Sequence, residues 1–151
     1  MFKWLGLSAF VIVLDLYTKQ LVVNAFAYGE HANITSFFDL VRYHNEGAAF
    51  SFLAGAGGWQ RIFFSVIALT ASAVIIYLLR KHPAQKLFCF ALALILGGAL
   101  GNLYDRLSLG YVVDFLYFHY NQYYWPAFNL ADSAITCGVV LLLIDSFKKP
   151  Q

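Results

Sequence analysis

Four long apolar stretches divide the chain, and polar connections separate them. Residues 62–79 form a run of 18 residues without a charged side chain, and residues 87–104 form a second run that one asparagine interrupts. Two further stretches, residues 4–27 and 127–144, are apolar apart from a few polar positions. Runs of this length cross the hydrocarbon core of a bilayer as helices. The pattern predicts an all-α membrane protein with four transmembrane helices, in a single domain of residues 1–151.

Composition supports this class and indicates an orientation. The chain is 61% hydrophobic and only 12% charged, which is typical of a small helical membrane protein and not of a soluble domain. With four spans, both termini and the short loop at residues 80–86 share one side. Most basic residues lie on that side: Lys3, Arg80, Lys81, Lys86, Lys148 and Lys149. This bias predicts that the termini face the cytoplasm and the two longer connections face outward. The small net positive charge reflects the same bias and gives no indication of nucleic-acid binding.

The first outward connection carries the pattern of a small β element. Residues 37–43 and 48–53 read as short strands around the turn sequence of residues 44–47. We therefore expect a β-hairpin, or cradle, between the first and second helices. Its phenylalanines would give the hairpin an apolar face suited to lipid or to a lipidated ligand.

Two acidic residues stand in apolar surroundings. Asp114 interrupts the run from Tyr111 to Phe118, and Asp132 lies near the start of the fourth apolar stretch. A carboxylate at the centre of a bilayer costs roughly 2.5 to 3.5 kcal/mol, so such residues usually have a partner or a function. Two carboxylates near the same membrane face indicate an acid/base pair.

Other polar residues fall at a similar depth. A rise of about 1.5 Å per residue places Asp132 roughly 18 Å, Asn102 roughly 22 Å and Asp15 roughly 16 Å from the inner boundary. Lys19 lies one turn above Asp15 on the same helix face, where the two can form an ion pair. The polar residues of three spans are therefore expected in the outer half of the membrane. Glycines at positions 97 and 101 form one row of the third helix and would allow a neighbouring helix to approach closely.

Several kinds of chemistry find no support in the sequence. His31, His44 and His119 are not spaced as metal ligands, and the cysteines form no ligand pair, so we expect no metal and no cofactor. A serine/lysine peptidase would need a serine near Lys19, and Ser8 and Ser51 are poor candidates. Three classes remain from the residues alone: an aspartyl peptidase, a small proton-coupled transporter that uses the intramembrane carboxylates, and a structural scaffold.

Five segments, in this order, carry a family resemblance. They are Asp15–Lys19 (DLYTK), Asn45–Ser51 (NEGAAFS), Gly97–Arg106 (GGALGNLYDR), Val112–Phe115 (VVDF) and Phe128–Ser133 (FNLADS). Together with the four spans they resemble bacterial lipoprotein signal peptidase, also called signal peptidase II or prolipoprotein signal peptidase. The resemblance covers nearly the whole chain.

The resemblance implies an aspartic endopeptidase of the bacterial inner membrane, with Asp114 and Asp132 as the catalytic pair. Its substrates would be prolipoproteins that carry a diacylglyceryl group, cleaved just before the lipidated cysteine, and the enzyme would act as a monomer. Supporting residues around the site would be Asn45, Gly47, Asn102, Asp105, Arg106 and Asn129. Asp15 and Lys19 would form a structural polar pair.

The chemistry of two neighbouring carboxylates agrees with this expectation. Repulsion between like charges splits their titration and leaves them sharing one proton near neutrality. The ionised member can then act on a water as general base, and the protonated member can act as general acid. The sequence does not assign the two roles to individual residues.

Overall fold

A computed structural model describes residues 1–47 and 58–148, and in these ranges the chain forms four helices and four strands. In chain order they are α1 (Phe2–Ala25), β1 (His31–Thr35), β2 (Phe38–Asn45), α2 (Trp59–Lys81), α3 (Lys86–Ser108), β3 (Val112–Tyr120), β4 (Tyr123–Tyr124) and α4 (Leu130–Lys148). Each helix is long and apolar enough to cross a membrane. The four predicted spans are therefore confirmed.

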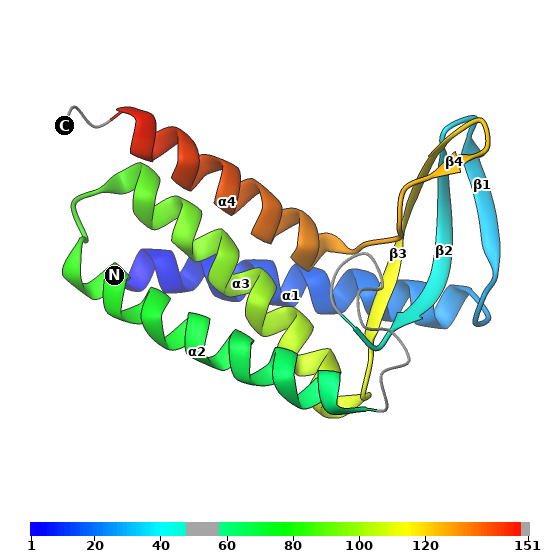
Figure 1. Cartoon of the computed structure of the whole chain (residues 1–151), viewed down its shortest axis with the longest axis horizontal. Helices are drawn as coiled ribbons and strands as arrows, with labels where there is room; N and C mark the ends of the chain where they lie inside the picture. The colour runs from blue at the N-terminus through cyan, green and yellow to red at the C-terminus, as the bar shows by residue number, and fades with distance from the viewer. Residues whose placement is uncertain (48–57, 149–151) are drawn as a thin grey trace.

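The helices lie side by side, and the strands stand at one end of them (Figure 1). The N-terminus, the end of α4 and the connection between α2 and α3 lie at the opposite end. Helix α3 is the central element, because it packs against each of the other three helices. The two ends of the described structure therefore differ. We name them after the predicted orientation: the outer end carries the sheet, and the inner end carries the N-terminus, the end of α4 and a short turn.

Glycines let α1 lie close against α3. A Cβ atom on Gly97 would stand 2.6 Å from the Cβ of Val11, and one on Gly101 would stand 2.6 Å from a carboxylate oxygen of Asp15. Both distances are shorter than real contacts, so only glycine fits at these positions. The prediction that Gly97 and Gly101 permit a close helix approach is confirmed.

The inner halves of α2 and α3 form an apolar core. Its buried members are Ile75, Leu79, Cys89, Leu92 and Leu96. Packing in this half relies on fitted apolar side chains and close backbone approach, which are the main sources of helix association within lipid. It is the part of the molecule that fixes the relative positions of the helices.

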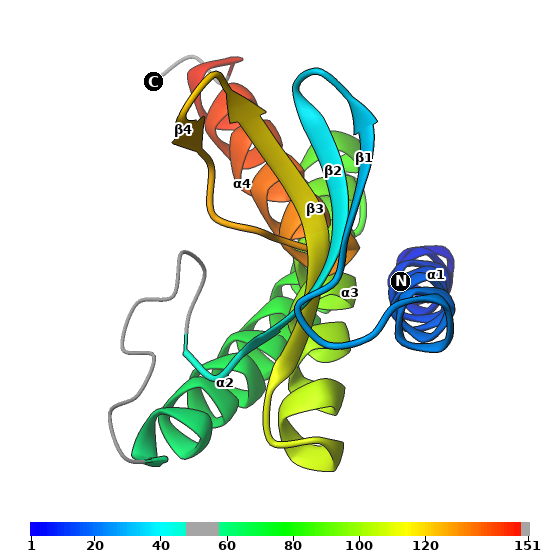
Figure 2. The ribbon, with the colours of Figure 1, turned by 90° about the vertical axis from the view of Figure 1, so that its right-hand side faces the viewer.

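The sheet is larger than the predicted hairpin. Strands β1 and β2 form an antiparallel hairpin between α1 and α2, and β3 pairs with β2, so that the strand order is β1-β2-β3-β4 (Figure 2). His44 and Asn45 belong to β2, which makes the prediction of a turn at residues 44–47 wrong in its first half. The second predicted strand, residues 48–53, lies outside the described residues. Strands β3 and β4 were not predicted.

Strand β2 is fastened to the end of α1. The guanidinium of Arg42 donates hydrogen bonds to the carbonyl oxygens of Val23 (3.2 Å) and Phe26 (2.9 Å). The last carbonyls of a helix have no partner within the helix, and a basic side chain there satisfies them. This cap holds the sheet at the outer end of the helices.

Candidate active site

Asp114 lies on β3, in the part of the sheet nearest the helices. It pairs in register with Tyr43 of β2, and only 3% of its surface is exposed. One carboxylate oxygen accepts a hydrogen bond from Asn129 (2.8 Å) and the other accepts one from Asn45 (3.0 Å). The carboxyl group is therefore held on both sides by amide donors.

The surroundings of Asp114 alter its acidity. The pKa of its carboxyl group is raised to about 7, chiefly by burial and then by the nearby charge of Asp132, against the opposing effect of the hydrogen bonds from Asn45 and Asn129 and of the charge of Lys19. A carboxyl group with a pKa near 7 exchanges its proton at neutral pH. Such values are a common property of groups that take part in acid/base chemistry.

Asp132 lies in the first turn of α4, and Asn129 caps that helix. The backbone N–H of Asp132 donates to the side-chain oxygen of Asn129 (2.9 Å), and the backbone N–H of Asn129 donates to the carboxylate of Asp132 (3.2 Å). This is a reciprocal capping arrangement. The other oxygen of Asp132 accepts a hydrogen bond from Asn102 of α3 (2.8 Å).

Helix α4 begins later than the sequence predicts. Pro126 and Ala127 were expected to start it, but the first helical residue is Leu130. The reason is that Phe128 pairs with Leu116 of β3 through two backbone hydrogen bonds, of 3.0 and 2.8 Å. This short bridge keeps the chain extended up to Asn129 and brings the start of α4 beside β3.

Two asparagines join the carboxylates into one network. The side-chain amide of Asn129 donates to Asp114 and also lies 3.1 Å from the side-chain oxygen of Asn102. Asn129 is fully buried. Since Asn129 also caps Asp132, a single side chain contacts both aspartates, one from the sheet and one from a helix.

Asp15, Lys19 and Asp105 form a buried ion cluster beside this network. The ammonium of Lys19 lies 2.7 Å from Asp15 and 3.0 Å from Asp105, and it donates to Asn102 at 3.0 Å. Asp105 also accepts a hydrogen bond from the backbone N–H of Val113 (3.2 Å). The expected pairing of Asp15 with Lys19 is present. Asp105, which was predicted to be a supporting residue of the site, contacts the lysine and the backbone of β3.

Arg106 reaches the segment that follows β2. Its guanidinium donates to the carbonyl oxygen of Gly47 (3.0 Å) and to that of Asn102 (3.3 Å), and it lies 5.5 Å from the ring centre of Phe64. Gly47 in turn donates its N–H to the side-chain oxygen of Asn45 (3.0 Å). Arg106 therefore supports the turn that holds Asn45 against Asp114.

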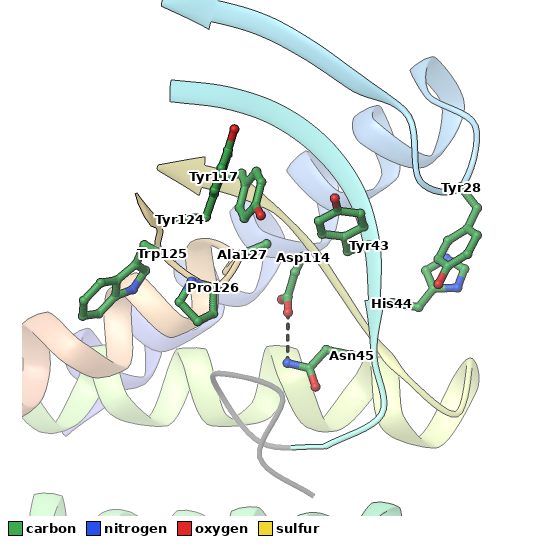
Figure 3. A pocket seen from close by; sticks show the side chains of 10 residues that line it. All are labelled: Tyr28, Tyr43, His44, Asn45, Asp114, Tyr117, Tyr124, Trp125, Pro126 and Ala127. Atoms are coloured by element: carbon green, nitrogen blue, oxygen red, sulfur yellow. Dashed lines mark hydrogen bonds between the residues drawn. The ribbon is translucent and has the colours of Figure 1, made fainter. Parts of the chain in front are cut away.

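A groove opens over Asp114. It has a volume of about 420 Å³, and Figure 3 shows Asp114 and Asn45 between Tyr28 and His44 on one side and Tyr117, Tyr124 and Trp125 on the other. The lining side chains that were not predicted are Tyr28, Tyr43, His44, Tyr117, Tyr124 and Trp125. The run of β-branched and aromatic residues at 111–118 is the sequence signal that could have identified β3 and, with it, part of this lining.

The site contains no evident metal centre. Within residues 1–47 and 58–148, no group of three histidine, cysteine or acidic side chains is arranged to hold a metal ion. Where the structure describes the groove, its lining is aromatic and amide in character, and the two carboxylates are already held by amide donors. The arrangement places a buried and a half-buried carboxyl group in one hydrogen-bond network beside a groove.

Known proteins are similar to this chain in sequence and in fold. Residues 7–148 match the protein family described as Signal peptidase (SPase) II. The lipoprotein signal peptidase of Ralstonia nicotianae is 59% identical over 97% of this chain and 84% of that protein, and the one from Paraburkholderia phytofirmans is 58% identical over 97% and 85%. A solved structure described as a bacterial membrane enzyme superposes with a TM-score of 0.86 at 30% identity, and covers 100% of this chain and 94% of that one. The chain therefore belongs to the signal peptidase II family, whose members remove signal peptides from lipoproteins, and it is a multi-pass protein of the bacterial inner membrane.

Proposed function

We propose that this peptidase is an aspartic endopeptidase in which Asp114 and Asp132, together called the dyad, activate a water molecule. The observation that carries the proposal is the pair itself: a buried carboxyl group from β3 and a half-buried one from α4 that share Asn129 as a hydrogen-bond partner. The raised pKa of Asp114, to about 7, supports a dyad that holds one proton at neutral pH. The alternative of a small proton-coupled transporter finds no support among the relatives.

The reaction needs both protonation states at once. The ionised carboxylate takes a proton from the water as its oxygen attacks the carbonyl carbon of the scissile peptide bond. The protonated carboxyl group gives its proton to the carbonyl oxygen, so the tetrahedral intermediate forms without a buildup of negative charge. When the C–N bond breaks, the leaving nitrogen receives the proton that came from the water, and a hydroxyl group of the intermediate returns its proton to the other carboxylate as the new carbonyl group forms. The dyad ends the cycle with one proton, as it began.

The surrounding amides suit this chemistry. Asn45 and Asn129 each donate to one oxygen of Asp114, while Asn102 and the backbone of Asn129 donate to the oxygens of Asp132. A carboxylate has about four lone-pair positions, so each oxygen keeps one for the water or the shared proton. Arg106 acts on the site by donating a hydrogen bond to the carbonyl oxygen of Gly47. Its guanidinium could also donate to a carbonyl oxygen of the substrate.

The substrate is proposed to be a prolipoprotein with a diacylglyceryl group on its cysteine, cleaved just before that cysteine. The groove over Asp114 is lined largely by aromatic side chains, which suit a polypeptide leaving an apolar environment. The start of α1 and the connection between α2 and α3 lie at the end opposite the sheet (Figure 1). Lys3 belongs to the start of α1, Arg80 and Lys81 to the end of α2, and Lys86 to the start of α3, whereas the dyad residues belong to β3 and the first turn of α4. By the bias of basic residues, the termini are cytoplasmic and the dyad is near the outer face. We infer that a single chain is sufficient for activity.

The test is cleavage of a synthetic diacylated prolipoprotein by purified protein, beside the same peptide without lipid. Asp114→Asn and Asp132→Asn should each lower the cleavage rate by at least about 1,000-fold, because each removes one partner of the proton exchange. Asp39→Asn is the matched control: Asp39 is a largely buried acid of β2 outside the dyad network, and its loss should change the rate only a few-fold. An Asp132→Asn protein that still cleaves would refute the dyad, and equal cleavage of the unlipidated peptide would refute the lipid requirement.

A further inference from the structure

Lys19 lies at the centre of the buried polar network. Its side chain is 4% exposed, and its ammonium contacts Asp15 (2.7 Å), Asp105 (3.0 Å) and the side-chain oxygen of Asn102 (3.0 Å). An ammonium has three N–H donors, and these three acceptors use all of them. Lys19 is therefore held in one position by three partners.

Each of the two carboxylates that pair with Lys19 also accepts a hydrogen bond from the backbone next to a dyad residue. The second oxygen of Asp15 accepts a hydrogen bond from the N–H of Ala131 (2.9 Å), and Ala131 immediately precedes Asp132. Asp105 accepts a hydrogen bond from the N–H of Val113 (3.2 Å), and Val113 immediately precedes Asp114. One ammonium is thus connected, through two carboxylates, to the residue before each aspartate.

The third partner controls a side chain of the dyad network. Asn102 accepts from Lys19 through its oxygen and donates to Asp132 through its amide nitrogen (2.8 Å). If this amide were reversed, its NH₂ group would face the ammonium and its oxygen would face the carboxylate. Both contacts would be repulsive, so Lys19 fixes the orientation in which Asn102 donates to Asp132.

We propose that Lys19 is a positioning residue for the dyad, which sets the placement of Asp114 and Asp132 through Asp105, Asp15 and Asn102. This inference rests on the proposed function and goes beyond a pair that only stabilises the bundle. Charge-assisted hydrogen bonds are shorter and stronger than neutral ones, which suits a role in holding two elements in register. A misplacement of about 1 Å at a reacting group can cost about 100-fold in rate.

The helix packing around Lys19 leaves room for the carboxylate of Asp15. Gly101 of α3 faces the carboxylate of Asp15, and a Cβ atom there would stand 2.6 Å from its oxygen. The glycine leaves the space that the carboxylate occupies between α1, α3 and α4. The charged groups that surround Lys19 from these elements and from β3 are Asp15, Asp105, Arg106, Asp114 and Asp132.

A positioning role and a purely structural role predict different kinetics. Lys19→Met keeps the length of the side chain but removes its charge and donors, and it leaves two buried carboxylates without a cation. That variant is expected to lose stability under either role. In Lys19→Met/Asp105→Asn the charge of the cluster returns to its original value, so the thermal midpoint should recover. A structural role predicts that kcat recovers with it.

The experiment compares kcat, KM and the thermal midpoint of the full-length proteins in detergent, with the diacylated peptide as substrate. For Lys19→Met/Asp105→Asn we expect a thermal midpoint near that of the unmodified protein, a kcat about 100-fold lower, and a KM within about threefold, because Lys19 does not touch substrate. Ser8→Ala is the matched control, since Ser8 lies on the same buried face of α1 and donates to α3 at the carbonyl of Ala93. Its kcat should be unchanged.

The outcomes separate this inference from the proposed function. Recovery of kcat together with the thermal midpoint would overturn the positioning role. Failure of the double variant to regain its thermal midpoint would also overturn it, because charge balance would then not be what Lys19 supplies to stability. Asp132→Asn is measured in the same series: if it still cleaves, the dyad itself is refuted, whereas an inactive Asp132→Asn beside a fully active Lys19 variant refutes the positioning role alone.

Discussion

The inner and outer halves of the helix bundle are held together in different ways. In the inner half, Leu79, Leu92 and Leu96 pack as interchangeable apolar volume. In the outer half, Lys19, Asn102 and other buried polar residues each have specific partners, and the same partners connect to the dyad. Within lipid, an unpaired polar group is costly, so these specific pairings restrict the arrangements that the outer half tolerates. Changes in either half can therefore alter stability, whereas the cleavage reaction depends on the outer half.

Outside the dyad itself, the largest effect is expected from Asn129→Ala, which removes the side chain that contacts both aspartates. The variant loses the helix cap, worth about 1 kcal/mol, and the hydrogen bond to the carboxyl group of Asp114, worth about 1.5 to 3 kcal/mol. We expect the cleavage rate to fall by about 100- to 1,000-fold. Steady-state cleavage of the diacylated peptide measures this.

Ser133→Ala provides the control for that variant. Ser133 lies in the same turn of α4 and donates only to the backbone oxygen of Asn129 (3.0 Å). Its rate should stay within a few-fold of the unmodified protein. Similar losses in the two variants would mean that helix stability, and not the bridging amide, limits the reaction.

A smaller effect concerns the pH dependence of stability. The pKa of Asp114 is about 7 in the folded protein, against 3.8 for an ordinary aspartate. Between these values the folded protein keeps a proton that the unfolded chain has released, so stability falls as pH rises from about 4 to 7 and levels off above. The component is on the order of 4 kcal/mol.

Asp114→Asn should remove this pH-dependent component. The neutral amide also turns an N–H group toward Asn45 or Asn129, which costs about 1 to 3 kcal/mol at all pH values. Thermal midpoints from pH 4 to 8 should therefore fall in the unmodified protein and stay flatter in the variant. Parallel curves for the two proteins would show that Asp114 does not carry the shifted proton.

The smallest effect should distinguish the two halves most directly. Gly98→Ala would place a methyl group against the backbone oxygen of Ala131, next to Asp132, and Gly138→Ala would place one against the backbone oxygen of Ala91 in the inner half. Both variants should lose about 1 to 3 kcal/mol of stability, because each separates α3 from α4. Only Gly98→Ala should lower kcat, by about tenfold. An equal fall in kcat for Gly138→Ala would contradict the comparison.

Much of this organisation follows from the sequence. The four spans, the shared depth of Asp15, Lys19, Asn102 and Asp132, and the hairpin between the first two helices were all predicted. Helical periodicity and apolar run length are local properties, so they survive without knowledge of the fold. The choice of Asp114 and Asp132 as a pair came from their apolar surroundings and from the family resemblance.

The sheet and the contacts of individual residues did not follow from the sequence. The role of Phe128 in holding the chain extended depends on Leu116, and Asp105 turned toward Lys19 because α1 lies close to α3 at Gly101. Strand pairing and helix contacts join residues far apart in the chain, and local pattern carries no information about which partners meet.

The sequence by itself determined a four-span membrane protein with costly polar residues near one face, because apolar length and burial cost act residue by residue. Only the tertiary structure decided that Asn129 joins the two aspartates and that Lys19 connects to the backbone before each of them. The physical reason is that hydrogen bonds are directional and short. Whether a carboxylate, an amide and an ammonium can meet is set by the packing of α1, α3, α4 and β3 against one another.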